Sequence, residues 1–371
     1  MEIKEFKLER FFGKYEFTAP YLLCCSDCES FAVSELLALE KKSGEKLDKL
    51  WLGYTESQGN PALRQEISRL YRDIKPEEII VTNGAEEGIF IFMNALLKGG
   101  DHILVQYPAY QSLYEIARSI GCEIIKWEMD DRNDWKLDFD FPKNKITEKT
   151  KTVVINSPHN PTGYLIPKEE LNELTCIAKK SKVHVFSDES YRFSEYQEKD
   201  RAPSVCEIYD KGVSLGGLSK AFGLSGLRIG WIATRDKKIL QRMLSFKDFT
   251  TMCCSAPSEF LSILALRHRE YLIKRNLEII EANLNLLDKF FEKYNHLFEW
   301  KRPAAGPIAF PRIKFDRNAG EFCKNLLDKK GVLLAPSTKF DFGNAHFRIG
   351  FGRKNMLEAL EKLGEYLKEN F

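Results

Sequence analysis

Lys220, near the middle of the chain, lies in a setting that suits covalent or acid–base chemistry. It follows the small residues Gly216 to Ser219, and Arg228 comes eight residues later, at the start of an apolar run that ends at Ala233. Glycines on both sides indicate a backbone that turns tightly or lies against a ligand. A lone lysine is usually a solvated surface residue, so its assignment depends on other unusual segments of the chain.

Three other polar segments each follow a short apolar stretch that is typical of a buried strand. In chain order they are residues 83–86, 156–163 and 187–191. In open parallel sheets, ligands bind in the loops beyond the carboxyl ends of the strands. The first segment also precedes a predicted helix, whose free backbone N–H groups would suit a phosphate. We therefore expect these loops and the Lys220 segment to form one ligand site.

Taken one at a time, these side chains also have ordinary structural interpretations. Asn160 stands in an Asn-Pro-Thr-Gly turn, where asparagine is a common turn former. Asp188 at a strand end could cap the next element, and Tyr110 and Tyr191 could be core aromatics. Arg348, on a predicted strand between apolar neighbours, could belong to a structural ion pair, because a buried polar group needs a partner in either case.

Short apolar strands alternate with predicted helices over most of the chain. This pattern predicts an α/β fold with a mainly parallel sheet that helices cover on both faces. After about Arg235 the pattern becomes helical, with one long periodic stretch from Ser258 to Tyr294, before a mixed carboxy-terminal part. We expect a large domain at 50–265 and a smaller, discontinuous α+β domain formed by 1–49 and 266–371. The predicted strands of the sheet are 79–82, 103–105, 122–127, 152–155, 183–186, 212–215 and 227–233.

The amino-terminal part and one internal segment have weaker patterns. We expect a charged start, a loop around residues 26–30 and a helix over 33–42, followed by a turn-rich loop that opens a helix at Pro61. Residues 130–151 are charged and irregular, as in a segment that runs over a surface.

The composition is that of an ordinary globular protein and gives no reason to expect a nucleic acid or a membrane as partner. Of the 371 residues, 43% are hydrophobic and 30% are charged, with a net charge of +2. The start of the chain lacks the apolar core of a secretory signal, and no apolar run approaches the ~20 residues of a membrane helix. We therefore expect a cytoplasmic protein.

Nine cysteines, an odd number in a chain without secretory features, favour reduced thiols over a disulfide framework. Cys24, Cys25 and Cys28 lie close together, and Cys253 and Cys254 form a second group. The two groups lack the paired C-x-x-C spacing of structural zinc sites. Buried or loop thiols are therefore the favoured interpretation, and we expect no metal.

The ordered set of motifs resembles the class I/II aminotransferases, fold-type-I enzymes that use pyridoxal 5′-phosphate. The motifs are Asn-Pro-Thr-Gly at 160–163, Asp188-x-x-Tyr191, Ser219-Lys220 with Arg228, and Phe-Arg-Ile-Gly at 347–350. The resemblance runs from about Tyr54 to Arg353. It implies that the cofactor acts as an electron sink that the protein tunes.

The resemblance implies a role for each motif residue around the cofactor ring. Lys220 would form the resting Schiff base and, once the substrate amine displaces it, move a proton between the substrate Cα and the aldehyde carbon of the cofactor. Asp188 would keep the pyridine nitrogen protonated. Asn160 and Tyr191 would donate to the phenolate oxygen, and Tyr110 would stack on the ring.

A phosphate site and a shared dimer site are implied in the same way. The family usually has Ser or Thr three residues before the lysine, where this chain has Gly217, so the other phosphate contacts would contribute more. Tyr54 resembles a tyrosine that reaches the phosphate from the partner subunit, which implies a homodimer. The other implied phosphate contacts are Gly84, Ala85 and Glu86 through their backbone N–H groups, Arg228 through its planar charged group, and Ser219.

The substrate site is the least constrained part of the resemblance. Arg348 would hold the substrate α-carboxylate by a two-point contact. The Ser26-Asp27-Cys28 loop falls where family members present a segment to the substrate. We hypothesise that Asp27 or Glu29 faces the side chain of the amino acid and favours a neutral or basic one.

The sequence therefore predicts a homodimeric aminotransferase that acts on an L-α-amino acid and a 2-oxo acid. Another pyridoxal-phosphate reaction, such as β-elimination, cyclisation or oxidation of an amino acid, remains the alternative, because the motifs serve the removal of a proton from Cα that all of these share. A ligand-sensing module fused to a DNA-binding domain is disfavoured, since Tyr54 already belongs to the fold. The identity of the amino donor stays open.

Overall fold

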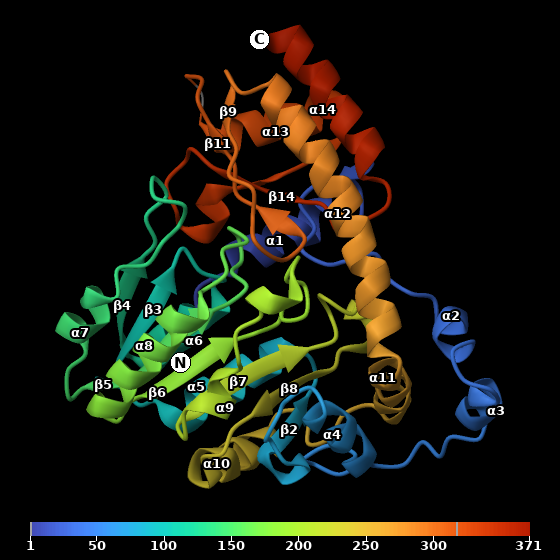
Figure 1. Ribbon diagram of the computed structural model, residues 1–371, viewed down its shortest axis with the longest axis vertical. Helices are drawn as coiled ribbons and strands as arrows, with labels where there is room; N and C mark the ends of the chain where they lie inside the picture. Colours follow the sequence, from blue (N-terminus) through green and yellow to red (C-terminus); the bar gives the residue numbers. More distant parts are fainter. Residues whose placement is uncertain (1, 317) are drawn as a thin grey trace.

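A seven-stranded sheet forms the centre of the molecule (Figure 1). The computed structural model describes residues 2–316 and 318–371. The strands are β2 (Ile79–Thr82), β3 (His102–Tyr107), β4 (Glu123–Glu128), β5 (Thr150–Asn156), β6 (His184–Asp188), β7 (Gly212–Gly217) and β8 (Gly230–Ala233). Their order is β2-β8-β7-β6-β5-β3-β4; β8 runs antiparallel to both of its neighbours, and the remaining neighbouring pairs are parallel. The prediction of an α/β fold with a mainly parallel sheet is confirmed.

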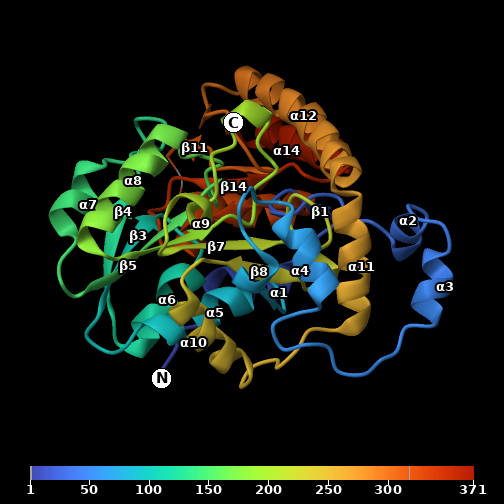
Figure 2. The ribbon, with the colours of Figure 1, turned by 60° about the horizontal axis from the view of Figure 1, so that its bottom comes forward.

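Helices cover both faces of this sheet, because each strand presents apolar side chains alternately to the two sides. The helices are α4 (Pro61–Ser68), α5 (Ala85–Leu96), α6 (Ser112–Ile120), α7 (Asp140–Lys145), α8 (Lys168–Ser181), α9 (Val205–Ile208), α10 (Lys237–Lys247) and α11 (Ala256–Arg267). Val105 and Val154 pack in one core with α5, α6 and α10, whereas their neighbours Leu104 and Val153 pack in another with α8 and α9. Figure 2 shows α5, α6 and α10 together on one side.

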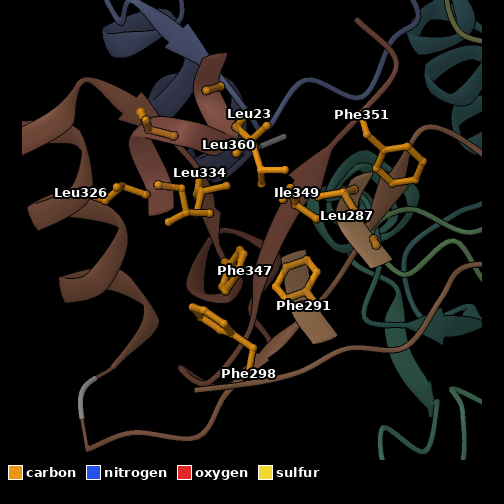
Figure 3. Close-up of a cluster of buried hydrophobic side chains, with 14 of the residues drawn as sticks. Leu23, Leu287, Phe291, Phe298, Leu326, Leu334, Phe347, Ile349, Phe351 and Leu360 are labelled. Carbon is orange, nitrogen blue, oxygen red and sulfur yellow. The ribbon is translucent and has the colours of Figure 1, made fainter. Parts of the chain in front are cut away.

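The carboxy-terminal elements form a second packed region that also holds an amino-terminal segment. Its helices are α12 (Arg269–Lys293), α13 (Ala319–Lys330) and α14 (Met356–Asn370). Its strands are β1 (Tyr21–Leu22), β9 (Phe298–Glu299), β10 (Ile308–Ala309), β11 (Arg312–Ile313), β12 (Val332–Leu333), β13 (Ala335–Pro336) and β14 (Phe347–Gly350). β1 pairs with β12, and Leu23 packs in the same core as Leu287 and Phe347 (Figure 3). The division into domains at residues 50 and 265 stays a prediction.

The amino-terminal part contains a helix that the sequence patterns did not predict. α1 (Lys7–Tyr15) lies where we expected only a charged start. Its apolar residues Leu8, Phe11, Phe12 and Tyr15 recur at helical spacing, but the charged residues between them hide the pattern. The helix expected over 33–42 is shorter, ending at Leu37 as α2 (Val33–Leu37), and a second helix that was not expected, α3 (Ser43–Asp48), follows it.

Three other boundaries differ from expectation for local backbone reasons. The long helix expected over 258–294 is broken at His268, whose φ of −109° and ψ of 23° are not helical. The last strand of the sheet begins at Gly230 instead of residue 227, because Arg228 has a left-handed backbone with φ 53°. The segment expected to be irregular contains α7. No helix of the described residues, including the 25-residue α12, has the length and apolar character needed to cross a membrane.

A substitution in the core shown in Figure 3 tests the packing of the second packed region. Leu287 on α12 is fully buried there. Leu287→Ala should lower the free energy of unfolding by about 2–5 kcal/mol, because it removes buried methyl groups and leaves a void. The midpoint of urea unfolding, followed by circular dichroism, measures this loss. Asn285→Ala, an exposed change on the same helix, should stay within about 0.5 kcal/mol of the parent, and equal losses in both variants would contradict the assignment.

Candidate active site

A cavity of about 480 Å³ lies beyond the carboxyl ends of β5, β6 and β7. Its opposite wall is formed by Phe6 and by α1, and Arg348 enters it from β14. It therefore occupies the place where ligands bind to open parallel sheets. The predicted site residues that line it are Ala85, Glu86, Tyr110, Asn160, Asp188, Tyr191, Ser219, Lys220, Arg228 and Arg348.

Lys220 lies in the loop that follows β7, with its amine in the cavity. Nζ donates a hydrogen bond to Ser26 Oγ at 2.8 Å and lies 5.7 Å from the centre of the Tyr191 ring. Ser26 comes from the amino-terminal segment, so the lysine is oriented by a residue far away in the sequence. An amine held in a cavity in this way can bond to a carbonyl compound or carry a proton.

Asp188 is the last residue of β6 and is buried beside the cavity. Ser190 donates to its Oδ1 twice, from the backbone N–H at 3.0 Å and from Oγ at 2.6 Å. Burial raises the pKa of Asp188, while the hydrogen bonds from Ser190 and the charge of Lys220 act in the opposite direction. A buried carboxyl group of this kind is stabilised as the anion by a cation at contact distance.

Tyr191 and Asn160 both line the cavity but differ in their hydrogen bonding. The hydroxyl of Tyr191 is buried and has no hydrogen-bond partner among the residues described. The Oδ1 of Asn160 accepts a hydrogen bond from Arg348, and its backbone N–H donates to Asn156. Burial lowers the pKa of the neighbouring His159 to about 3, and this neutral ring bonds to Thr162 and to the Pro108 carbonyl. His159 thereby holds the loop that positions Asn160.

Arg348 is 1% exposed and has no carboxylate partner in residues 2–316 and 318–371. Its Nε and Nη2 donate to the Cys24 carbonyl at 3.1 and 2.9 Å, and its Nη1 donates to Asn160 Oδ1 at 3.0 Å. The alternative of a structural ion pair is therefore wrong. A buried charge without a counter-charge is unfavourable, so this guanidinium suits an anion that enters the cavity.

The amino terminus of α5 and Arg228 form the other end of the cavity. Gly84 precedes the helix with a left-handed φ of 83°, and a Cβ atom there would lie 2.4 Å from Nη2 of Arg228. A Cβ on Gly230 would lie 2.6 Å from the backbone nitrogen of Ala85. Because Gly84 and Gly230 have no side chain, the guanidinium of Arg228 can lie close to the backbone N–H groups at the start of α5. This arrangement is suited to binding phosphate.

The carboxyl group of Glu86 faces this same end. Burial raises the pKa of Glu86 to about 7, although a hydrogen bond with the Ser112 hydroxyl acts against the shift. The group is therefore partly protonated at neutral pH. Its repulsion of an anion at the helix terminus is correspondingly weaker than that of a full charge.

Asp27 and Glu29 do not line the cavity. The carboxylate of Asp27 pairs with Arg353, whose Nη2 lies 3.1 Å from both of its oxygens. Glu29 accepts a hydrogen bond from the backbone N–H of Lys354 at 3.0 Å. This corrects the expectation that Asp27 or Glu29 faces the substrate side chain, because the arginine neutralises Asp27 outside the cavity.

Tyr54 lies outside the cavity of its own chain and is 82% exposed. Its expected contact with a phosphate in a partner subunit stays a prediction.

The cysteines show no metal-site geometry. All nine are free, and no group of three or more His, Cys, Asp or Glu side chains within the described parts of the chain could hold a metal ion. The contribution of Cys24 to the cavity is its backbone carbonyl, which accepts hydrogen bonds from Arg348.

Sequence reasoning missed the cavity residues that come from the amino-terminal part. Phe6, Glu9 and Phe12 line one wall, and Ser26 holds Lys220. The helical spacing of apolar residues in α1 could have revealed a helix, but its place over the cavity is a tertiary contact. Glu9 accepts a hydrogen bond from the Tyr110 hydroxyl at 2.9 Å across a separation of 101 residues.

Comparison with known proteins identifies the family. The family model named aminotransferase class I and II matches residues 23–363. The chain belongs to this family. Over 367 residues the aminotransferase is 26% identical to a probable aspartate aminotransferase of Methanocaldococcus jannaschii, and the match covers 94% of this chain and 95% of that protein. It is also 26% identical to a capreomycidine synthase of Streptomyces vinaceus, with 97% and 93% of the two chains covered.

Solved structures support the same conclusion. A PLP-dependent aminotransferase from Streptococcus suis superimposes with a TM-score of 0.94 at 33% identity, covering 100% of this chain and 99% of that one. The PLP-dependent cyclase OrfR has a TM-score of 0.91 at 27% identity, with 100% and 99% covered. The protein is therefore a fold-type-I aminotransferase that uses pyridoxal 5′-phosphate, where PLP is the abbreviation for that cofactor.

The cavity fits this cofactor at four points. Asp188 suits a protonated ring nitrogen, and the partnerless hydroxyl of Tyr191 suits an oxygen on the ring. Gly84 and Arg228 leave room for an anion at the amino terminus of α5. Lys220 lines the same cavity and could bond to the aldehyde.

A substitution at the end of the cavity that suits the phosphate tests the cofactor site. Gly84→Ala should weaken cofactor binding about tenfold or more, because its Cβ would collide with Arg228 and strain a left-handed backbone. Titration of the apoprotein with pyridoxal phosphate, followed by absorbance, measures the dissociation constant. Gly226→Ala is the matched control, since a Cβ there meets no atom within 4 Å. An unchanged dissociation constant in Gly84→Ala would show that phosphate binds elsewhere.

Proposed function

We propose that this enzyme moves the amino group of an L-α-amino acid with a neutral or basic side chain to a 2-oxo acid, with its cofactor attached to Lys220. One observation carries the proposal: Lys220 shares a cavity with Asp188 and with a buried Arg348 that lacks a counter-charge. The lysine supplies the amine, the aspartate suits a cationic ring nitrogen, and the arginine suits a carboxylate. Together they match an α-amino acid held beside the cofactor.

The protein's part at the cofactor is to hold the ring and keep it electron-poor. When bound, pyridoxal phosphate supplies the electron sink for the charge left on the substrate Cα. Asp188 would pair with the ring nitrogen and keep it protonated, while Tyr191 and Asn160 would donate to the ring oxygen. Tyr110 would lie against the ring. The residues that would anchor the phosphate are Gly84, Ala85, Glu86, Ser219 and Arg228.

Arg348 and Lys220 are the residues that would act on the substrate in the cavity. Arg348 would hold the α-carboxylate, and its bonds to the Cys24 carbonyl and to Asn160 fix the direction of the guanidinium. Lys220 Nζ would remove the proton from Cα and return it at the aldehyde carbon of the cofactor. Ser26 Oγ accepts a hydrogen bond from this amine and so helps to orient it.

Cyclisation is the second candidate, because two similar proteins are named capreomycidine synthase and PLP-dependent cyclase. Removal of the proton from Cα is common to both reactions, so the same residues would serve either. The fate of the amino group separates them. Transamination leaves it on the cofactor, whereas cyclisation leaves it on the product.

Single-turnover spectroscopy tests the proposed function. Holoenzyme mixed with one amino acid at a time should lose the absorption of the bound aldehyde, gain that of the pyridoxamine form, and recover the first spectrum when a 2-oxo acid is added. Lys220→Ala should slow this half-reaction by about 10²–10⁴-fold or more, because it removes the acid–base group. Borohydride treatment should fix the cofactor on Lys220 in the parent.

The control for this test is Lys237→Ala, which removes an exposed lysine from the start of α10. It should keep the rate and the adduct of the parent. A cyclised amino acid without pyridoxamine formation would favour the second candidate, and full turnover in Lys220→Ala would overturn the assignment of the lysine.

We infer that the enzyme is a homodimer with shared active sites. Trp51, Leu52, Tyr54 and Phe249 are large apolar or aromatic residues that are exposed in the single chain. The segments that carry them lie side by side, because Thr55 donates to the Cys254 carbonyl and Ser57 to Asp248. Exposed apolar groups gathered on one face favour an interface, and a second copy would bring Tyr54 to the partner's phosphate. The cytoplasmic location expected from the sequence stays a prediction.

Two exposed phenylalanines test this interface. Phe249 is 90% exposed and Phe17 is 89% exposed, but the second follows α1 in the chain and belongs to neither of the segments named above. Phe249→Arg should lower the measured molar mass from that of a dimer toward that of one chain, because it places a charge in an apolar contact. Phe17→Arg should leave the mass unchanged. Light scattering after size exclusion measures both, and a monomeric parent would contradict the inference.

A further inference from the structure

Glu9 presents a carboxylate to the active-site cavity that no step of the proposed function uses. It lies in the first turn of α1, and Phe6, Leu8 and Phe12 of the same segment also line the cavity. Figure 1 shows α1 between the sheet and the carboxy-terminal elements. Glu9 Oε1 accepts a hydrogen bond from the Tyr110 hydroxyl at 2.9 Å. No cation in the described ranges pairs with Glu9, whereas Asp27 is neutralised by Arg353.

The proposed function assigns no group of the cofactor or the substrate to Glu9. Its charged lining residues are Glu9, Glu86, Asp188, Lys220, Arg228 and Arg348. In the proposed function Arg228 and Arg348 would face the phosphate and the substrate carboxylate, Lys220 would bond covalently to the cofactor, and Asp188 would face the ring nitrogen. Glu86 lies at the phosphate end beside Ser112. Glu9 is therefore the carboxylate that remains for the rest of the substrate.

The position of Glu9 suits the far end of an amino-acid side chain. Glu9 and Phe12 are three residues apart on α1, so their side chains are neighbours, with Cβ atoms about 5–6 Å apart. The centre of the Phe12 ring lies 5.5 Å from Cζ of Arg348. A substrate whose α-carboxylate binds Arg348 would thus pass an aromatic surface before it reaches Glu9. That path suits an apolar stem with a polar nitrogen at its end.

We propose that Glu9 binds the terminal nitrogen of the substrate side chain and selects an amino acid with an ω-amino or guanidino group. This inference rests on the proposed function, and it assigns to α1 the contact with the substrate side chain that the sequence had suggested for Asp27 or Glu29. A carboxylate accepts charge-assisted hydrogen bonds from an ammonium or guanidinium group. It would repel the second carboxylate of an acidic substrate.

The hydrogen bond from Tyr110 offers a purely structural role for Glu9, that of fastening α1 over the cavity. Glu9→Gln separates the two roles. The amide oxygen can still accept the hydrogen bond from Tyr110, but the negative charge is lost. Glu9→Asp keeps the charge on a shorter side chain and should retain part of the selectivity.

The test compares arginine with citrulline, which has nearly the same shape but no charge. In the parent holoenzyme, the apparent second-order rate constant of the half-reaction should favour arginine by about tenfold or more, as expected for a charge-assisted hydrogen bond. In Glu9→Gln this preference should largely disappear, while the rate with citrulline stays within about twofold. Glu5→Gln, an exposed change of the same charge on the same segment, should keep the preference of the parent.

Binding provides a readout that does not depend on turnover. The arginine analogue that lacks the α-amino group should bind the holoenzyme about tenfold more tightly than it binds Glu9→Gln, as measured by calorimetry. An unchanged preference and unchanged analogue binding in Glu9→Gln, or a parent that prefers citrulline, would overturn the role of Glu9. If no amino acid altered the cofactor spectrum, the proposed function would fail, and analogue binding would still decide the role of Glu9.

Discussion

The active site depends on the burial of one guanidinium without a counter-charge. Arg348 of β14 is held by the Cys24 carbonyl near the amino terminus and by Asn160 in the loop after β5. Three segments that are distant in the chain therefore meet at a single charged group. Neutral acceptors orient it but do not cancel its charge, and the proposed function therefore places the substrate carboxylate there.

The two ends of the cavity are built from different kinds of structure. The cofactor end uses strand ends and the amino terminus of α5, where the backbone of a packed sheet holds Asp188 and Arg228 in place. The substrate end uses α1 and the loop at Ser26, which join the sheet to the carboxy-terminal elements. The residues proposed to hold the cofactor thus come mainly from the sheet and α5, whereas those proposed to select the substrate side chain come from the amino-terminal segment.

Much of the sheet could be predicted because its strands are short, apolar and buried on both faces. The polar loops that follow them could also be predicted, since residues such as Asn160 and Asp188 interrupt an apolar pattern at a strand end. The predictions of helices were wrong where the local sequence pattern did not indicate the structure that forms. α1 combines a helical apolar spacing with many charges, and the non-helical backbone at His268 divides a continuous periodic pattern.

The sequence by itself determined the family, the cofactor and the strands of the central sheet, because these depend on motifs and periodicities a few residues long. Tertiary structure alone decided which acid of the amino-terminal segment faces the cavity. Asp27 lies 326 residues from its partner Arg353, and Glu9 lies 101 residues from Tyr110. Ion pairs and hydrogen bonds form between groups that folding brings within about 3 Å of each other, and local spacing carries no information about such distant neighbours.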